Sequence, residues 1–97
     1  MREITVPTDR TFTRADLIPV VVRRRAVDHP HAIPFEHFRG EEWRPVTMDE
    51  TVRQVDRIAA GLIASGVKPG DRVALMAETR LEWVLVDLAV WTAGAVT

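Results

Sequence analysis

The stretch RVALMAETRLEWVLVDLAVWTAGAVT, residues 72–97, decides the fold class of this protein. Residues 73–77 are apolar at consecutive positions, which is typical of a strand that is covered on both faces in a parallel sheet. Thr79 and Glu82 have the spacing of a capping box, and they predict a helix that ends at Gly94. Because this helix is apolar on almost every side, it needs cover from more than one direction.

A buried strand followed by a buried helix is the first part of a βαβ unit. Such a unit takes about 30 residues or more to place its second parallel strand, whereas this stretch has 26. Residues 95–97 are therefore expected only to open the second strand. We predict an α/β chain that forms the incomplete N-terminal part of a larger domain. It is a single partial domain over residues 1–97, with an extended arm over residues 1–14.

A second helix is the clearest element upstream of this unit. Thr47 and Glu50 form a capping box, and Gly66 is expected as the left-handed residue that ends the helix. Apolar residues recur at helical spacing between them. They are Val52, Val55, Ile58, Ala59, Leu62 and Ile63.

An earlier helix and a hairpin are predicted from weaker signals. The helix is expected from Asp16, as its N-cap, to Asp28, where His29-Pro30 ends it. Its apolar face is expected to consist of Leu17, Val20, Val21 and Val27. Residues 32–38 and 43–46 predict two short antiparallel strands joined by a glycine-containing turn.

Composition and charge exclude several functional classes. The chain is 46% hydrophobic and 28% charged, as in a globular protein. Its 13 basic and 14 acidic residues give a net charge of −1, which favours neither nucleic acid nor an anionic membrane as partner. Without cysteine, thiolate metal sites and a cysteine nucleophile are excluded. The longest apolar stretch is broken by Asp87 and is too short to span a bilayer, so no transmembrane segment is expected.

No motif for catalysis or nucleotide binding is present. Neither the phosphate-loop pattern nor the dinucleotide-binding pattern occurs. The single lysine, Lys68, lies in a turn and the single serine, Ser65, lies at a helix end, so structural roles are favoured for both. His29 and His31 flank a proline without a third spaced ligand, which favours a loop over a metal site.

The arginine run and the tryptophans also have structural interpretations that outweigh functional ones. Three consecutive arginines, residues 23–25, fan out around a helix, so a solvated face is favoured over a basic binding patch. Trp43, Trp83 and Trp91 are expected to be core and packing residues, because no basic residues are interleaved with them as in a base-stacking platform.

Residues 43–97 resemble the N-terminal region of adenylate-forming enzymes, the AMP-binding acyl-CoA synthetase superfamily. The resemblance rests on a tryptophan before a capped helix and on three short segments. These are IAAGL at 58–62, GVKPGDRV at 66–73, and LAV at 88–90 leading to GAV at 94–96. Residues 79–83, TRLEW, are similar to a segment of the long-chain fatty acyl-CoA ligases, as are the arm and Asp28-His29-Pro30. Residues 46–48 depart from the pattern, because many members carry an aromatic residue there.

The resemblance implies an intact enzyme that joins ATP and a fatty acid into an acyl adenylate, releases pyrophosphate, and then forms the CoA thioester. ATP, magnesium and CoA are thus implied for that enzyme. In the family their binding residues lie further along the chain, so no catalytic, cofactor-binding or metal residue is assigned within residues 1–97. Structural roles are favoured for Asp71, after a tight turn, and for Glu82, in a capping box.

The resulting prediction is a scaffold segment of a long-chain fatty acid–CoA ligase that is inactive alone. Its partner is the rest of its own polypeptide. The resemblance places the intact enzyme in the cytoplasm and leaves peripheral membrane association open. Two alternatives stand beside it: an adenylate-forming ligase for an aryl or amino acid, and a self-contained, non-catalytic interaction module whose apolar third helix docks a partner.

Overall fold

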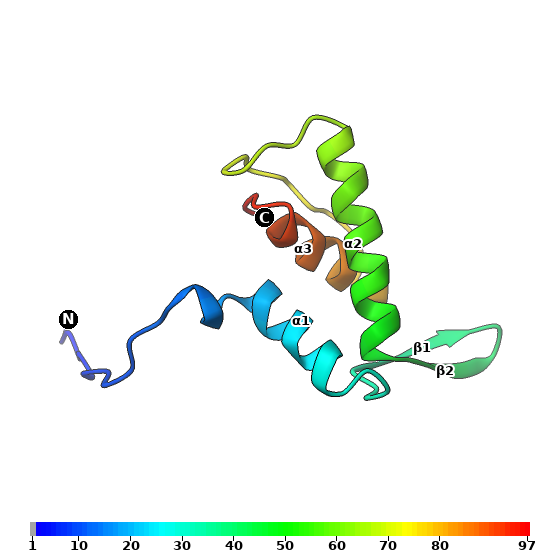
Figure 1. The fold of residues 1–97 in the computed structure, drawn as a ribbon, viewed down its shortest axis with the longest axis horizontal. Coiled ribbons are helices and arrows are strands. Elements are labelled where there is room, and N and C mark those ends of the chain that lie inside the picture. The colour runs from blue at the N-terminus through cyan, green and yellow to red at the C-terminus, as the bar shows by residue number, and fades with distance from the viewer. Residues whose placement is uncertain (1) are drawn as a thin grey trace.

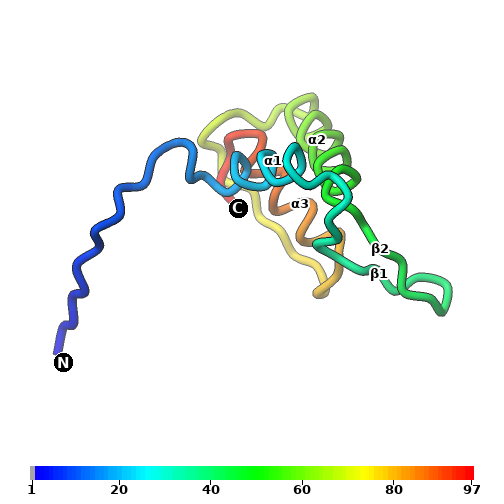
Figure 2. The backbone as a smooth tube through the Cα atoms, turned by 60° about the horizontal axis from the view of Figure 1, so that its bottom comes forward, coloured from blue at the N-terminus to red at the C-terminus, as the bar shows by residue number. Residues whose placement is uncertain are grey.

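The computed structural model describes residues 2–97 as a mixed α/β chain, which confirms the predicted fold class (Figure 1). Residues 2–13 contain no helix or strand and extend away from the rest of the molecule (Figures 1 and 2). The elements that follow are η1 (Arg14–Asp16), α1 (Ile18–Asp28), β1 (Phe35–Arg39), β2 (Glu42–Val46), α2 (Met48–Ala64) and α3 (Leu81–Thr92). None of the helices in this part of the chain is both long and apolar enough to cross a membrane.

The N-cap of helix α1 lies one residue later than predicted, because Asp16 caps a different element. The Asp16 carboxylate accepts the backbone N–H of Thr13 at 2.9 Å and so completes a capping box around the 3-10 helix η1. This hydrogen bond, assisted by Arg10, lowers the pKa of Asp16. Leu17 is then the N-cap of α1 and offers no side-chain hydrogen bond. Pro19 lies in the first turn and the helix ends at Asp28, as predicted.

The predicted apolar face of α1 is wrong, since it points away from the other helices. The exposed fractions of its four members are 55% for Leu17, 39% for Val20, 47% for Val21 and 78% for Val27. Pro19 and Val22 instead line a small space together with Val55 of α2 and Leu88 of α3. In this orientation α1 turns Arg23 toward α2. The Arg23 guanidinium donates to both carboxylate oxygens of Asp56, at 2.6 and 3.1 Å.

The hairpin is tighter than predicted. β1 pairs with β2 in antiparallel register, with Phe35 opposite Val46. Gly40 and Glu41 both have positive φ, 60° and 70°, which corresponds to the type I′ turn that matches the twist of a two-residue hairpin. The first strand starts after Pro34 rather than at residue 32, because the pairing register ends at Phe35.

Helix α2 begins with the capping box predicted for it. The Thr47 hydroxyl accepts the Glu50 backbone N–H at 3.2 Å, and the Glu50 carboxylate accepts the Thr47 backbone N–H at 2.9 Å. The latter bond is the main reason why the pKa of Glu50 is lowered. Two more free amides at this end, those of Met48 and Asp49, donate to carbonyls of the segment before β1. The helix start is thereby joined to the chain that leads into the hairpin.

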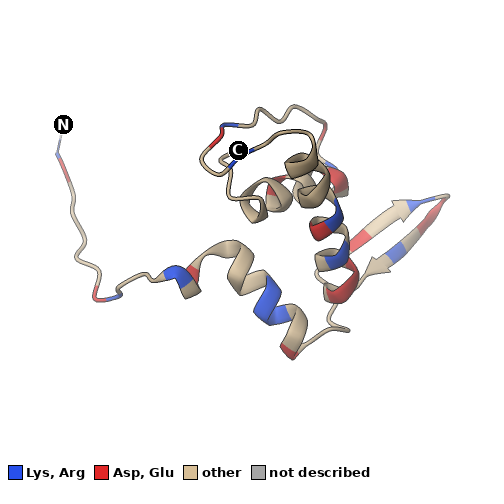
Figure 3. Cartoon of the chain, turned by 45° about the horizontal axis from the view of Figure 1, so that its top comes forward, with Lys and Arg blue, Asp and Glu red and all other residues tan. Residues whose placement is uncertain are grey.

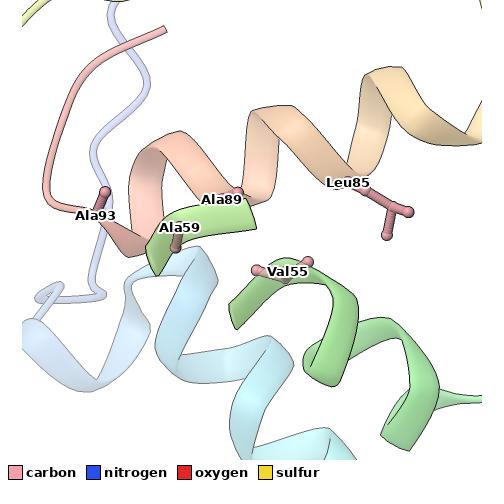
Figure 4. Packing of buried hydrophobic residues seen from close by; sticks show 5 residues of the cluster. All are labelled: Val55, Ala59, Leu85, Ala89 and Ala93. Atoms are coloured by element: carbon pink, nitrogen blue, oxygen red, sulfur yellow. The ribbon is translucent and has the colours of Figure 1, made fainter. Parts of the chain in front are cut away.

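The core lies between α2 and α3 and is made largely of small side chains. Its five buried members are Val55, Ala59, Leu85, Ala89 and Ala93 (Figure 4). Small side chains such as alanine allow packed helices to approach closely. The predicted face of α2 is confirmed at Val55 and Ala59, whereas Ile63 is 56% exposed at its C-terminal end.

The second predicted capping box does not form. Arg80 is the N-cap of α3 and supplies no side-chain hydrogen bond to the helix amides. Glu82 accepts two hydrogen bonds from the Arg80 guanidinium, at 2.8 and 3.3 Å, instead of reaching back to the backbone of Thr79. That pair is the main cause of the lowered pKa of Glu82. At the other end Gly94 has φ 81° and ends the helix as predicted.

Candidate functional site

Two segments on either side of α3 meet as the beginning of a parallel sheet. Arg72 and Val96 form a parallel bridge. The Val73 backbone N–H donates to the Val96 carbonyl at 2.8 Å, and the Val96 N–H donates to the Asp71 carbonyl at 2.8 Å. The predicted opening of a second parallel strand is therefore present, with α3 as its crossover helix.

The turn before this bridge is held rigidly against the end of α3. The Asp71 carboxylate accepts the Lys68 backbone N–H at 2.8 Å, and the Asp71 N–H returns to the Lys68 carbonyl at 3.0 Å. The Gly70 N–H donates to the Gly94 carbonyl at 2.9 Å. A Cβ on Gly94 would lie 3.4 Å from that of Pro69. Backbone contacts thus set the direction in which the two strands leave α3.

Beyond the bridge the chain has no sheet partner within residues 2–97. Residues 74–79 form no strand and make no backbone hydrogen bond to another segment of that range. Met76 is 99% exposed and Val96 is 53% exposed, whereas Val73 and Leu75 are partly covered. The buried strand predicted over residues 73–77 is therefore not formed within residues 2–97, where the pairing is limited to the bridge at Arg72. Free backbone donors and acceptors beside exposed apolar side chains are the features to which another strand adds.

Residues that might have carried chemistry are found in local structural contacts. The Ser65 hydroxyl donates to the Gly61 carbonyl at 2.8 Å, which ties it to the end of α2. Lys68 lies exposed in the turn, and His29 and His31 are exposed in a loop. Over residues 2–97 no three acidic, histidine or cysteine side chains lie close enough to hold a metal ion together.

The tryptophans and arginines differ from prediction in part. Trp43 is 66% exposed, so it is not a core residue, and its ring packs against Phe38 with centroids 5.2 Å apart. Trp83 is 37% exposed. Arg24 and Arg25 lie on a solvated face as predicted. The Arg23–Asp56 pair was not predicted, because its members lie 33 positions apart and only the placement of α1 on α2 brings them together.

Comparison with known proteins now decides the family. Residues 22–97 match the family described as AMP-binding enzyme. The chain belongs to the AMP-binding enzyme family. It is 37% identical over 97 residues to the long-chain-fatty-acid–CoA ligase FadD15 of Mycobacterium tuberculosis, covering 100% of this chain and 16% of that protein. It is also 40% identical over 73 residues to a feruloyl-CoA synthase of Amycolatopsis, covering 75% of this chain and 14% of that one.

A solved structure shows the same fold. The fatty acyl-adenylate ligase from L. pneumophila, determined in complex with acyl adenylate and pyrophosphate, superposes with a TM-score of 0.72 at 32% identity. The match covers 79% of this chain and 14% of that one. The arrangement of this AMP-binding family chain is thus that of the N-terminal portion of adenylate-forming ligases. The chain spans about a sixth of the length of the ligase that it matches throughout, 16%.

Proposed function

We propose that this chain is the N-terminal scaffold segment of a long-chain fatty acid–CoA ligase. The observation that carries the proposal is the 37% identity to such a ligase over all 97 residues, arm and α1 included. In the intact enzyme, ATP and a fatty acid give an acyl adenylate and pyrophosphate, and CoA then displaces AMP to form the thioester. The enzyme acts in fatty acid metabolism in the cytoplasm.

The scaffold role follows from what the chain holds rigid and what it leaves open. The α2–α3 core and the turn at residues 68–71 fix one parallel bridge. The edge beyond that bridge, with Met76 and Val96 exposed, is suited to receive further strands of the same polypeptide. Covering it would bury apolar surface and satisfy the free backbone groups at once.

Within residues 2–97, the local roles of the acidic residues support the view that magnesium and nucleotide are bound elsewhere in the enzyme. Asp71 and Glu82 are the acidic residues nearest to the bridge and the start of α3, and both accept hydrogen bonds that hold local structure. We therefore assign ATP, magnesium and CoA to the remainder of the enzyme and derive no catalytic step from residues 2–97.

Two experiments test this function. The isolated chain, mixed with ATP, palmitate and CoA, should release no more pyrophosphate than a heat-denatured control, and release above that control would contradict the proposal. The coding DNA beyond Thr97 should continue in frame into a Thr/Ser/Gly-rich phosphate loop. The longer product should form palmitoyl-CoA, and a longer product without any adenylating activity would overturn the proposal.

A second candidate function is an aryl-CoA ligase, because the chain is 40% identical to a feruloyl-CoA synthase over 73 residues. The long-chain ligase is preferred because its match extends over the whole chain. Assay of the longer product with ferulate beside palmitate discriminates the two. A clear preference for ferulate would replace the first proposal by the second.

A further inference from the structure

The outer side of α1 carries two rows of apolar and basic side chains. Helical geometry places residues four and seven apart on one line. One row is therefore formed by Val20, Arg24 and Val27, and the next by Leu17, Val21 and Arg25. The apolar members are 39–78% exposed, and both arginines are exposed. Apart from Leu17, which borders Trp91 of α3, this outer face of α1 lies opposite the side that packs on α2 and α3.

The arginines of the outer face make no ion pair in the part of the chain that the structure describes. Arg23 points toward α2 and forms an ion pair with Asp56. Neither Arg24 nor Arg25 lies within ion-pair distance of a carboxylate in residues 2–97. The basic residues form a band in the middle of α1, and an acidic residue follows at its end (Figure 3). The local charge of α1 is thus positive although the whole chain is nearly neutral.

Further apolar groups are exposed near the N-terminal end of α1. Leu17 and Ile18 line a shallow hollow together with Trp91 of α3. Phe12, just before η1, is 70% exposed. The guanidinium of Arg10 lies 5.1 Å from the centre of its ring. Exposed aliphatic and aromatic groups beside arginine are the composition of helices that lie in a membrane interface.

We propose that the outer face of α1 binds an anionic lipid surface. The valines and Leu17 would enter the boundary between headgroups and acyl chains, while Arg24 and Arg25 contact lipid phosphates. Arginine is well suited to this contact because its planar guanidinium donates two hydrogen bonds to one phosphate. Attraction of basic residues to anionic headgroups adds to the burial of apolar area.

The two arginines make the outer face of α1 suited to a different partner from that of the open sheet edge. The edge exposes Met76 and Val96 with free backbone groups and is suited to another strand. On α1 the backbone is already bonded within the helix, and a protein partner would have to desolvate two guanidinium groups or supply carboxylates for them. An anionic membrane supplies the phosphates and leaves the arginine heads hydrated.

The inference is independent of the proposed ligase function, since lipid binding requires no catalysis. Where both hold, the helix would keep the enzyme at the surface in which a long-chain fatty acid dissolves. A negative result in the activity assay therefore does not contradict lipid binding, and absence of lipid binding does not contradict the ligase function.

Vesicle cosedimentation of the 97-residue chain tests the proposal. Vesicles of phosphatidylcholine alone are compared with vesicles containing phosphatidylglycerol. Binding is expected only to the anionic vesicles, and it should weaken as the salt concentration is raised. Because each basic residue near such a surface contributes about a fivefold change in partitioning, R24Q/R25Q should reduce binding roughly 25-fold.

The matched control removes the same two charges elsewhere. Arg53 and Arg57 lie exposed on α2. R53Q/R57Q should bind at least severalfold better than R24Q/R25Q. A third variant, L17S/V27S, should also bind weakly while keeping its helix content by circular dichroism, since serine is a favourable N-cap at residue 17.

Three outcomes would overturn the proposal. One is absence of binding to anionic vesicles. Another is equal loss of binding in R24Q/R25Q and R53Q/R57Q, which indicates general charge attraction. The third is equal binding to neutral vesicles, which indicates adhesion of the apolar sheet edge and leaves the outer face of α1 for a protein partner.

Discussion

Substitution of Gly94 by alanine should destabilise the chain through the backbone. Gly94 ends α3 with φ 81°, a conformation that L-residues with a Cβ rarely adopt. A non-glycine residue held there costs about 1–2 kcal/mol, and the smaller freedom of the unfolded alanine chain recovers about 0.4–1 kcal/mol. The added Cβ would lie 3.4 Å from the Cβ of Pro69, which is close to ordinary contact. The net cost is therefore about 1 kcal/mol and comes from φ.

The same substitution at Gly61 is the matched control, and it should change the free energy of unfolding in the opposite direction. It lies inside α2, has helical φ, and a Cβ built on it meets no atom within 4 Å. Gly61→Ala should therefore stabilise the chain by about 0.5–1 kcal/mol. The two variants, which differ from the protein by the same methyl group, should be separated by roughly 2 kcal/mol.

Urea titration followed by circular dichroism at 222 nm measures this separation. With a slope of about 1–3 kcal/mol per molar urea, the two midpoints should differ by roughly 0.7–2 M, with the unsubstituted chain between them. The order of the three midpoints remains readable even where the transition is broad. A Gly94→Ala variant as stable as the Gly61→Ala variant would refute the geometry assigned to the end of α3, and with it the placement of the parallel bridge.

Other contacts give smaller effects. Thr47→Ala should cost about 1 kcal/mol in the same titration, because it removes the N-cap of α2; an unchanged midpoint would contradict the capping box. The pKa of Glu50 is lowered by the Thr47 backbone hydrogen bond, so its stabilisation is present above the ordinary glutamate pKa and is lost as the pH falls through the lowered one. A pH titration of helix content should show this loss, and Glu50→Gln should remove it. The Arg23–Asp56 pair is about half exposed on both sides, 49% and 45%, so a double-mutant cycle should give a coupling of about 0.2–1 kcal/mol that salt reduces. Met76→Lys should lower self-association in sedimentation velocity, since it places a charge on the open edge; a sharp, cooperatively melting monomer without the substitution would favour a self-contained module.

The sequence predicted structure best where both partners of a contact lie within a few residues. Thr47 and Glu50 satisfy each other three positions apart, and Gly66 ends α2 with φ 104°. The same pattern at residues 79–82 failed, because Arg80 offers Glu82 a charged donor that competes with the backbone. The arginine between Thr79 and Glu82 thus competes with their capping box, whereas Arg14 does not prevent the box that Thr13 and Asp16 form around η1.

The orientation of α1 could not be predicted from spacing. Val20, Val21 and Val22 are consecutive, so they offer several apolar faces at once. The face of α1 that packs on α2 is the one next to Arg23, whose guanidinium donates to Asp56. That contact exists only when α1 already lies on α2. Local periodicity carries no information about such a distant partner.

The sequence predicted an apolar segment that needs sheet neighbours, while the geometry of its pairing could not be predicted. Residues 73–77 are apolar at consecutive positions, which is typical of a strand in the interior of a parallel sheet. That the first bridge joins Arg72 to Val96, and that residues 74–79 remain unpaired beyond it, depends on the turn at Asp71 and on the packing of Gly94 against Pro69.

Amide hydrogen exchange of the 97-residue chain, resolved by NMR, tests most directly whether this edge is open. The amides of Val73 and Val96 donate to backbone carbonyls and should exchange slowly. Those of residues 74–77 should exchange close to the rate of an unstructured peptide. Slow exchange along the whole of residues 73–77 in the Met76→Lys variant, under conditions where it is monomeric, would show a strand that is already paired within the chain, and would contradict the scaffold role.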